Sequence, residues 1–423
     1  VGNGILLAKE LSNKLGNTSQ VSVFKRFGTA MFKYQQTELE FVGARKESYS
    51  EDSRKPHVED GTLEDDQKRR DFTINTLAIS MNKATFGELI DPFNGVEDLN
   101  NKIIKTPLEP NVTYSDDPLR MMRAIRFAAQ LDFEIEKESF QSIIDNAERI
   151  NIVSFERVMD EFQKIMMTDK PSVGLLLLEQ SGLLQYILPE LIALKGIEEV
   201  EGQKHKDNFY HTLEVVDNIS ENTDNVWLRW AALLHDIGKA VTKRFDKKVG
   251  WTFHSHEFVG SKMTVKLFRR LKLPLGNQMK YVQKLVMMSS RPIAVVTDDA
   301  TDSALRRLLF DAGEDFDDLI TLCKADITTK NEKKQRRFKQ NFEVVEQKIK
   351  DVEERDHLRN FQPPISGEQI MELFDIKPGK EIGILKNAIK EAILEGEVEN
   401  NYNSALEFVI NMGKELNLVP KNI

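Results

Sequence analysis

The sequence predicts a mainly α-helical protein of the α+β class, because its strand-like segments are confined to the first quarter of the chain. Two stretches, QVSVFKRFGTAMFKY (20–34) and ELEFVGARKESY (38–49), have strand character and flank the polar turn QQTE. From Pro107 onward, apolar residues recur at helical spacing almost throughout the 423-residue chain. Strand-like segments therefore occur only before residue 107, and helical segments make up most of the remaining chain.

The elements follow in order along the chain. ILLAKELSNKL (5–15) predicts an opening helix, and the two strand segments come next. DFTINTLAISMN (71–82) is interpreted as a helix, and ELIDPFNG (88–95) as a short strand or turn. The later helices are broken at LPEL, KLPLGN and QPPISG, and the basic run KNEKKQRRFKQ (330–340) leads into a long charged helix.

The composition is that of an acidic globular protein. Charged residues make up 30% of the chain and hydrophobic residues 40%, and the formal net charge is −9. This balance excludes a globally basic nucleic-acid coat, so contact with nucleic acid has to use local basic patches. Cys323 is the only cysteine, which excludes an intrachain disulfide and predicts a reducing compartment. Because no apolar run reaches the roughly 18 residues of a membrane span, we expect a cytoplasmic protein without a membrane partner.

The stretch YSDDPLRMMRAIRF (114–127) combines two carboxylates, a proline and regularly spaced arginines. Asp117 is a good N-cap residue and Pro118 suits the first helical position, so a helix is expected to begin here. Steps of three place three guanidinium groups on one broad face, those of Arg120, Arg123 and Arg126. That face is either a solvated surface paired with the two aspartates or a binding face for an anion.

Three segments together carry a family resemblance: EDDQKRRDFTINTLA (64–78), DPFNGVEDL (91–99) and DDPLRMMRAIRFAA (116–129). In combination they closely resemble the class II tRNA nucleotidyltransferase and bacterial poly(A) polymerase family, within the polymerase β superfamily. The similarity runs through essentially the whole chain. The resemblance implies a polymerase-β-like nucleotidyltransferase head at 1–106, a helical neck for base recognition and RNA binding at 107–200, an HD domain at 201–330 and a helical tail at 331–423.

The resemblance also assigns the reading of the incoming base. It implies that Asp117 and Arg120 contact the base, with Asp116 beside them where the family more often has glutamate. Cytosine and adenine both offer an amino donor next to an unprotonated ring nitrogen, which suits an aspartate acceptor and an arginine donor. Uracil and guanine offer a carbonyl and an N–H in these places, so both contacts would fail. CTP and ATP are therefore the expected nucleotides.

Three arginines match family positions that hold the nucleotide, which we interpret as its triphosphate: Arg70, Arg123 and Arg126. Arginine suits this role because its planar fork binds phosphate oxygens in two places at once. Asp71 matches a position near the ribose, and Asn75 is expected to order the same loop.

The family's chief metal-binding carboxylates lie in a G-x-x-x-x-D-x-D stretch, and this sequence contains no such stretch. Two Mg²⁺ ions activate the attacking 3′-hydroxyl and neutralise the leaving pyrophosphate in this chemistry. The resemblance therefore implies a head that is incomplete at its N-terminus and, in this chain alone, poor in nucleotide transfer. Glu40 is the candidate for the superfamily's third, catalytic carboxylate, and its alternative is an exposed strand glutamate.

Five of the seven histidines fall between residues 205 and 256. His235 and Asp236 are adjacent in the apolar stretch WAALLHDIGK, where unpaired polar side chains are costly. Together with His211 and Asp326 they resemble the metal site of an HD domain, which hydrolyses phosphomonoesters or phosphodiesters by metal-activated water. Such ligands suit Mg²⁺, Mn²⁺, Ni²⁺ or Zn²⁺, and His256 is a candidate for a second metal or a phosphate. A core histidine is the alternative, and MMSSRPI (287–293) lacks a histidine that related sequences often have.

Basic patches at 262–272 and 330–340 are either solvated faces or contacts to the acceptor and T-arm of tRNA, which the resemblance implies as partner. The first hypothesis is an enzyme that adds CCA to tRNA 3′ ends. The alternatives are a poly(A) polymerase or an A-only or CC-only enzyme, an HD phosphohydrolase with an inactive head, and an RNA-binding module without chemistry. The sequence leaves the oligomeric state open.

Overall fold

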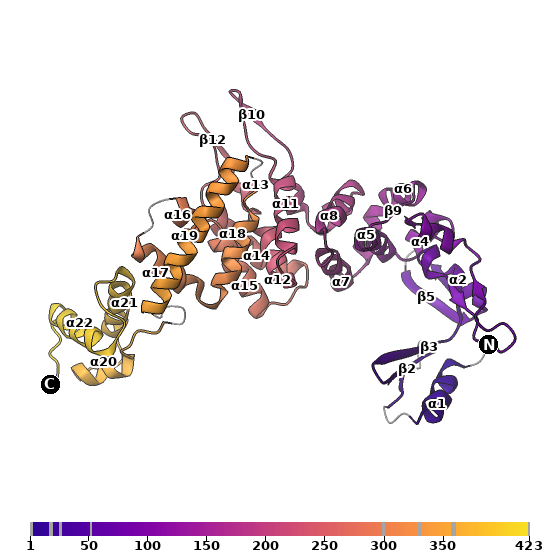
Figure 1. The fold of residues 1–423 in the computed structure, drawn as a ribbon, viewed down its shortest axis with the longest axis horizontal. Helices are drawn as coiled ribbons and strands as arrows, with labels where there is room; N and C mark the ends of the chain where they lie inside the picture. The colour runs from indigo at the N-terminus through magenta and orange to yellow at the C-terminus, as the bar shows by residue number, and fades with distance from the viewer. Residues whose placement is uncertain are drawn as a thin grey trace. The chain divides into compact units, whose positions relative to one another are not determined.

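The protein is represented by a computed structural model that describes residues 3–16, 20–24, 28–50, 53–297, 301–328, 331–356 and 361–421. The chain divides into two compact units, Val1–Pro189 and Glu190–Ile423 (Figure 1). The first unit combines short sheets with helices, and the described part of the second consists mainly of helices with two small hairpins. The predicted α+β class with a helical majority is confirmed.

A helix packed on a three-stranded sheet opens the first unit. Its elements are α1 (Gly4–Lys14), β1 (Ser22–Phe24), β2 (Thr29–Tyr34) and β3 (Thr37–Val42). The sheet is antiparallel in the order β1-β2-β3, and α1 packs on β2 and β3. Ala8, Ala30 and Phe32 form the buried core between helix and sheet. The opening helix and the two strand segments are therefore confirmed.

The segment that follows contains a wrong prediction. Its elements are β4 (Arg45–Ser50), β5 (Ser53–Asp60), α2 (Leu63–Lys68), the 3-10 helix η2 (Thr73–Asn75), β6 (Ala78–Ile79) and β7 (Leu89–Ile90). The helix expected over 71–82 is replaced by η2 and β6. The stretch is rich in β-branched residues, which lose side-chain freedom in a helix. Its backbone also finds partners outside the stretch, because the Thr73 amide donates to the Lys105 carbonyl (2.8 Å) and β6 pairs with β7.

The rest of the first unit is helical apart from one short parallel strand pair. Its elements are α3 (Gly95–Asn100), β8 (Ile103–Ile104), α4 (Pro110–Asp116), α5 (Leu119–Leu131), β9 (Glu134–Ile135), α6 (Lys137–Asn146), η3 (Ala147–Ile152), α7 (Phe155–Met166), α8 (Pro171–Gln180) and α9 (Leu184–Ile187). α5 begins one residue later than predicted, with Pro118 at the N-cap, while the Asp117 carboxylate accepts from the Leu119 amide (3.3 Å). Its apolar face packs against α7 and α8. The side chains of Arg120, Arg123 and Arg126 are each only partly exposed.

The second unit builds a helical body and a tail. Its elements are α10 (Pro189–Ile192), β10 (Glu199–Val200), β11 (Gln203–Lys204), α11 (Asn208–Ser220), α12 (Val226–Leu234), α13 (Lys239–Thr242), β12 (Arg244–Asp246), β13 (Gly250–Thr252), α14 (His256–Arg270), α15 (Asn277–Met288), α16 (Arg291–Thr297), α17 (Asp302–Ala312), η4 (Gly313–Asp315), α18 (Phe316–Ala325), α19 (Glu332–Asp356), α20 (Gly367–Phe374), α21 (Lys380–Glu395) and α22 (Tyr402–Glu415). The predicted long charged helix is α19, and α20 begins at the last residue of QPPISG with a capping box on Ser366.

The core of the helical body surrounds α12. This helix contacts α11, α15 and α18, and its buried side chains include Trp230 and Leu233. α12 ends at Leu234, so the His235–Asp236 pair follows directly from the buried helix. Among the described helices, none is long and apolar enough to cross a membrane.

Candidate functional site

The first signature segment and the arginine helix meet at Asp71. The Arg123 side chain donates to Asp71 Oδ2 (2.6 Å), and the Asn75 amide donates to Asp71 Oδ1 (2.9 Å). Asp71 is buried, so both carboxylate oxygens are satisfied by fixed partners. The expectation that Asn75 orders this loop agrees with its contact to Asp71.

Two further arginines fasten the same loop. Arg120 on α5 donates to the Arg69 carbonyl (2.6 Å). Arg70 donates to the Asn75 carbonyl (2.9 Å) and is ion-paired with Asp66 (3.1 Å). Because the Arg70 side chain is nearly half exposed, its guanidinium is the more accessible of these charges. Side chains of α5 therefore hold this loop in place. The loop itself does not form the helix that the sequence predicted over 71–82.

A small cavity of about 160 Å³ lies beside this loop. Its lining residues are Lys46, Asp65, Lys68, Arg69, Leu108, Val112, Thr113, Asp116 and Arg120. Cations outnumber carboxylates in the lining, which favours an anionic or hydrogen-bonding ligand. Burial raises the pKa of Asp116, although Arg120 and Arg149 oppose the shift.

Asp117 adjoins this cavity in sequence but is not among its lining residues. Its carboxylate lies 3.7 Å from an Arg157 guanidinium nitrogen, in addition to its contact with the Leu119 amide. The base-reading roles assigned to Asp117 and Arg120 stay predictions. Asp116, in contrast, does share the cavity with Arg120.

Arg126 points to a different partner from the other arginines. Its guanidinium lies 2.6 Å from the Glu161 carboxylate on α7 and 3.9 Å from the centre of the Phe127 ring. Both members of the ion pair are largely buried, so the contact joins α5 to α7. Glu161 was not singled out in the sequence, although it lies among the apolar residues of α7. The triphosphate role of Arg126 stays a prediction.

Glu40 lies on β3 opposite Met31 and is exposed. It lines a shallow cavity of about 320 Å³ together with Phe24, Thr29, Val42 and Arg45. Glu40 is the single carboxylate among these lining residues. Its catalytic role stays a prediction.

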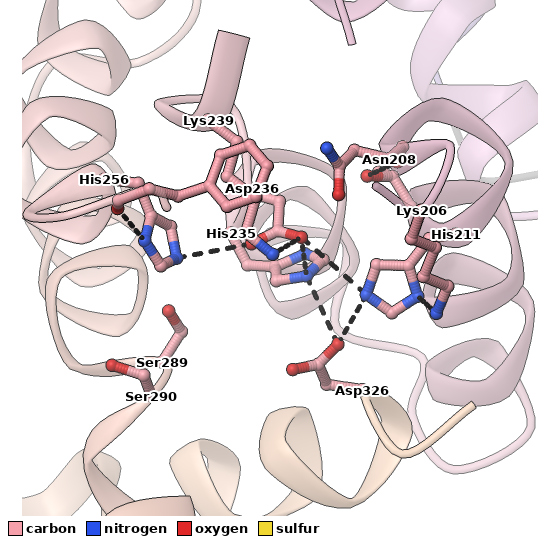
Figure 2. Close-up of polar contacts among 12 residues, drawn as sticks. Lys206, Asn208, His211, His235, Asp236, Lys239, His256, Ser289, Ser290 and Asp326 are labelled. Atoms are coloured by element: carbon pink, nitrogen blue, oxygen red, sulfur yellow. Dashed lines mark hydrogen bonds and ion pairs between the residues drawn. The ribbon is translucent and has the colours of Figure 1, made fainter. Parts of the chain in front are cut away.

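The histidines and aspartates of the second unit converge on one centre (Figure 2). His211 comes from α11, His235 and Asp236 follow α12, His256 begins α14 and Asp326 follows α18. His211 Nε2 lies 2.8 Å from Asp326 Oδ1 and 3.7 Å from Asp236 Oδ2. His235 Nε2 lies 3.4 Å from Asp236 and 3.5 Å from Asp326, and His256 Nε2 lies 3.4 Å from Asp236 Oδ1. All five predicted residues are therefore brought together.

The hydrogen bonds around the centre set the histidine tautomers. His235 Nδ1 lies 2.7 Å from the Ala232 carbonyl and His256 Nδ1 lies 2.9 Å from the Phe253 carbonyl. A carbonyl only accepts, so both Nδ1 atoms carry the proton and leave Nε2 as the ligand atom of the neutral rings. His235 Nε2 is buried and makes no hydrogen bond among the described residues. His211, His235 and Asp236 offer ligand atoms within 4.8 Å of one another, so these residues fit a divalent metal.

The charges at the centre also favour a cation. Burial alone would raise the pKa of Asp236, but His235, His256 and Lys239 lower it well below its usual value. Burial would lower the pKa of His235, but Asp236 and Asp326 raise it to about 10. Two ionised carboxylates in one buried place attract positive charge, which a proton or a metal ion supplies.

Two lysines at this centre were missed in the sequence. Lys239 Nζ donates to Asp236 Oδ2 (2.7 Å), and the spacing of three residues in HDIGK is the signal that predicts it. Lys206 Nζ lies 2.7 Å from His211 Nδ1, and no local pattern indicates this contact. Ser289 and Ser290, from the stretch that lacks a histidine, lie near His256 (Figure 2), where Ser290 donates to Glu257.

The other two histidines of the group lie outside the centre. The His205 ring is buried against Trp251, and its Nδ1 lies 2.8 Å from the Lys206 carbonyl. His254 is exposed.

Arginines gathered around Asp71 in one unit and a histidine–aspartate centre in the other are typical of enzymes that act on nucleotide phosphates. Three family models match the chain: the poly A polymerase head domain at 3–105, the probable RNA and SrmB-binding site of polymerase A at 132–195, and the HD domain at 208–312.

Named relatives show the same family. An A-adding tRNA nucleotidyltransferase of Deinococcus radiodurans is 33% identical over 347 residues, covering 79% of this chain and 76% of the relative. A CCA-adding enzyme of Pediococcus pentosaceus is 28% identical over 391 residues, covering 92% of this chain and 83% of the relative. The apo form II structure of a CCA-adding enzyme shares the fold, with a TM-score of 0.63 at 19% identity over 97% of this chain and 85% of that one.

The chain belongs to the tRNA nucleotidyltransferase and poly(A) polymerase family, and it carries an HD domain. It is accordingly a nucleotidyltransferase, and the nucleotidyltransferase and HD families are generally dependent on divalent metals.

Proposed function

We propose that the protein adds C and A to the 3′ ends of tRNA from CTP and ATP without a nucleic-acid template. The observation that carries this proposal is the meeting of the two signature segments. Arg123 is ion-paired with Asp71, and Arg120 donates to the Arg69 carbonyl. One nucleotide can therefore contact Arg123, a phosphate-binding candidate, and Arg120, a base-reading candidate, at the same time.

The choice of C and A follows from the base edges. Asp117 accepts from the amino group and Arg120 donates to the ring nitrogen that cytosine and adenine share. A poly(A) polymerase, an A-only enzyme and a CC-only enzyme are the alternatives, and the named relatives include both A-adding and CCA-adding enzymes. Asp117 and Arg120 are complementary to both cytosine and adenine, which favours the full CCA activity.

The assignment extends to metal, RNA and domains. Mg²⁺ supplies activation of the 3′-hydroxyl and neutralisation of pyrophosphate, with Glu40 as one carboxylate. The basic segments 262–272 and 330–340 contact the phosphates of the tRNA acceptor and T-arm.

The predicted domain ranges are supported by the three family matches, each of which lies within one of them. The single, buried Cys323 supports a place in the cytoplasm.

Nucleotide incorporation by the complete gene product tests this proposal. Labelled CTP and ATP are supplied with Mg²⁺ to tRNA lacking CCA and to tRNA that already ends in CC. Addition of all three nucleotides to the first substrate supports a CCA-adding enzyme. Addition of A to the second substrate alone would make it an A-adding enzyme, and no incorporation into either would overturn the proposal.

We also propose that the HD centre hydrolyses phosphomonoesters or phosphodiesters. His211, His235, Asp236 and Asp326 would hold a divalent metal that activates a water molecule, and His256 contacts a second metal or the phosphate. The test compares hydrolysis and nucleotide incorporation in an Asp236→Asn variant. Loss of hydrolysis with retained incorporation supports the assignment, and unchanged hydrolysis would refute it.

A further inference from the structure

The turn between α4 and α5 carries the residues assigned to base reading. Asp116 ends α4, Asp117 is an extended residue between the two helices, and Arg120 lies in the first turn of α5. Side chains recognise a base edge only when their donors and acceptors lie near its plane at hydrogen-bond distance. The position of this turn therefore decides which bases are accepted.

The break between α4 and α5 leaves the Ser115 carbonyl without its usual helical donors. In a continuous helix this carbonyl would accept from the amide four residues later. The Leu119 amide donates to Asp117 Oδ1 instead (3.3 Å). Pro118, three residues after Ser115, has no N–H. The Ser115 carbonyl is therefore available to a donor from outside the two helices.

Arg149 supplies this donor. It lies on η3, 34 residues further along the chain, and its guanidinium donates to the Ser115 carbonyl (2.9 Å). A cation at the C-terminal end of a helix is also favoured by the helix dipole. Burial raises the pKa of the Asp116 carboxyl, and the charges of Arg120 and Arg149 oppose this effect. Arg149 thus acts on the turn through a hydrogen bond and through its charge.

Neutral side chains hold the rest of α4 to α6. The Tyr114 and Ser139 hydroxyls lie 2.7 Å apart, and both residues are buried. Near the start of α4, Asn111 accepts from the Ser142 hydroxyl (2.7 Å). These contacts fix the body of the helix, whereas the contact of Arg149 fixes its last turn, next to the two aspartates.

A second arginine approaches the same turn but holds it less firmly. Arg157 on α7 lies 3.7 Å from the Asp117 carboxylate, and its side chain is 42% exposed. Ion pairs with this degree of exposure contribute little, because water and salt screen them. The hydrogen bond of the Arg149 guanidinium is assisted by its charge and is shorter. Arg149 is therefore the stronger of the two anchors.

We infer that Arg149 is a positioning residue for nucleotide selection, because it fixes the turn that presents Asp117 and Arg120 to the base. The inference rests on the proposed addition of C and A and assigns a further residue to it. Arg149 acts through the turn rather than on the reacting phosphate. A displaced turn loses its pairing with cytosine and adenine, while uracil and guanine had no such pairing to lose, so selectivity falls.

Nucleotide selection by the complete gene product tests this role. CTP is compared with UTP on tRNA lacking CCA, and ATP is compared with GTP on tRNA ending in CC. The proteins are the unmodified chain, Arg149→Met, Arg149→Lys and Tyr114→Phe. Tyr114→Phe is the matched control, because it removes a buried contact of the same helix and leaves the Ser115 carbonyl bonded. Urea denaturation measures the stability of each variant.

Arg149→Met should lower the selectivity, the ratio of kcat/KM for CTP to that for UTP, by about tenfold or more. The change should come from a higher KM for CTP and ATP with kcat largely retained, because base contacts are lost equally in the ground state and the transition state. Arg149→Lys should restore most of the selectivity, since lysine can donate to the same carbonyl. Tyr114→Phe should lower the urea midpoint and keep the selectivity.

Unchanged selectivity in Arg149→Met, or an equal loss in Tyr114→Phe, would overturn the positioning role. Equilibrium binding of CTP and UTP in the presence of Ca²⁺ separates this result from a failure of the proposed function. A preference for CTP that depends on Arg149, without any incorporation, would refute nucleotide addition and support the positioning role. Equal affinity for CTP and UTP together with no incorporation by the unmodified protein would overturn both.

Discussion

Asp71 is the residue through which the two signature segments of the first unit are joined. Its carboxylate is buried and accepts from Arg123 on α5 and from Asn75 within its own loop. A buried carboxylate with two fixed donors holds those donors in place, because leaving any of them unpaired is costly. Asp71 therefore fixes the position of Arg123, which is predicted to contact the triphosphate of the nucleotide.

Replacing Arg123 tests this role. We expect Arg123→Met to reduce nucleotide incorporation at least about tenfold and to lower the free energy of unfolding by about 1–3 kcal/mol, since Asp71 loses its cation. Incorporation assays and urea denaturation measure the two effects. In a double-mutant cycle with Asp71→Asn, the two changes should be strongly non-additive. Additive effects would show that the pair does not act as a unit.

The raised pKa of His235 predicts that the stability of the metal-free protein depends on pH. Asp236 and Asp326 raise its pKa from 6.5 to about 10, against the effect of burial. The stability that the charged ring contributes is thus fully present below pH 6.5 and is lost as the pH rises to about 10. Thermal denaturation with a chelator should show this fall. Added Mn²⁺ should reduce it, because the neutral ring is the ligand form.

Two histidine variants provide the comparison for this prediction. His235→Gln should remove this part of the pH dependence, whereas His254→Gln should retain it because His254 is exposed. The same pH dependence in His235→Gln and in the unmodified protein would contradict the assignment.

At the scale of elements, a buried ion pair joins α5 to α7. Arg126 and Glu161 lie 2.6 Å apart with little exposure, and Lys164 also contacts Glu161. Removing one charge leaves a buried guanidinium poorly paired, so Glu161→Gln should lower the free energy of unfolding by about 2–4 kcal/mol. Asp160→Asn is the matched control, because Asp160 is exposed and contacts the same lysine. We expect that control to change stability by less than about 0.5 kcal/mol, and equal effects of the two variants in urea denaturation would refute the argument.

Gly238 sets the approach of α14 to the segment that follows α12. A Cβ at this position would lie 2.1 Å from the His256 carbonyl oxygen and 2.9 Å from the Gly260 amide nitrogen. Gly238→Ala should therefore displace the start of α14, which carries His256, and weaken Mn²⁺ binding about tenfold or more. Gly383→Ala is the control, since no atom lies within 4 Å of its Cβ. Unchanged Mn²⁺ affinity in Gly238→Ala would show that the backbone adapts.

At the scale of the whole molecule, an acidic protein presents a local basic face. The net charge is −9, yet Lys262, Lys266 and Arg269 are exposed on one side of α14. Their spacing of four and three residues keeps the three charges on one helix face. Such a face can contact phosphates even though the chain as a whole repels them.

Salt dependence measures this contribution to RNA binding. Replacing the three residues by glutamine should weaken tRNA binding. The logarithm of the association constant should then fall less steeply with the logarithm of the salt concentration, by about 2–3 in slope. The control variant replaces Lys247 and Lys248 by glutamine, because both are exposed on the turn between β12 and β13. An equal loss of slope in the two variants would show a general charge effect rather than a defined contact.

The sequence by itself determined the fold class, the first helices of the chain and the residues that are proposed for both sites. Helical periodicity and capping residues placed α1 and the start of α5 within a residue or two, since helix formation depends on neighbours three and four positions apart. The adjacent His235–Asp236 pair in an apolar stretch indicated a buried polar centre. These signals are local and therefore readable along the chain.

Only the tertiary structure decided which partner each charged group takes. Arg126 shares its spacing with Arg123, yet it faces Glu161 on another helix rather than Asp71. Lys206 reaches Thr328, which lies 122 residues later. Likewise, Ala78 and Ile79 within the stretch 71–82 pair with β7 instead of continuing a helix. Packing brings together residues that are far apart in sequence, and the free energy of burying a charge or a backbone amide depends on those neighbours rather than on local periodicity.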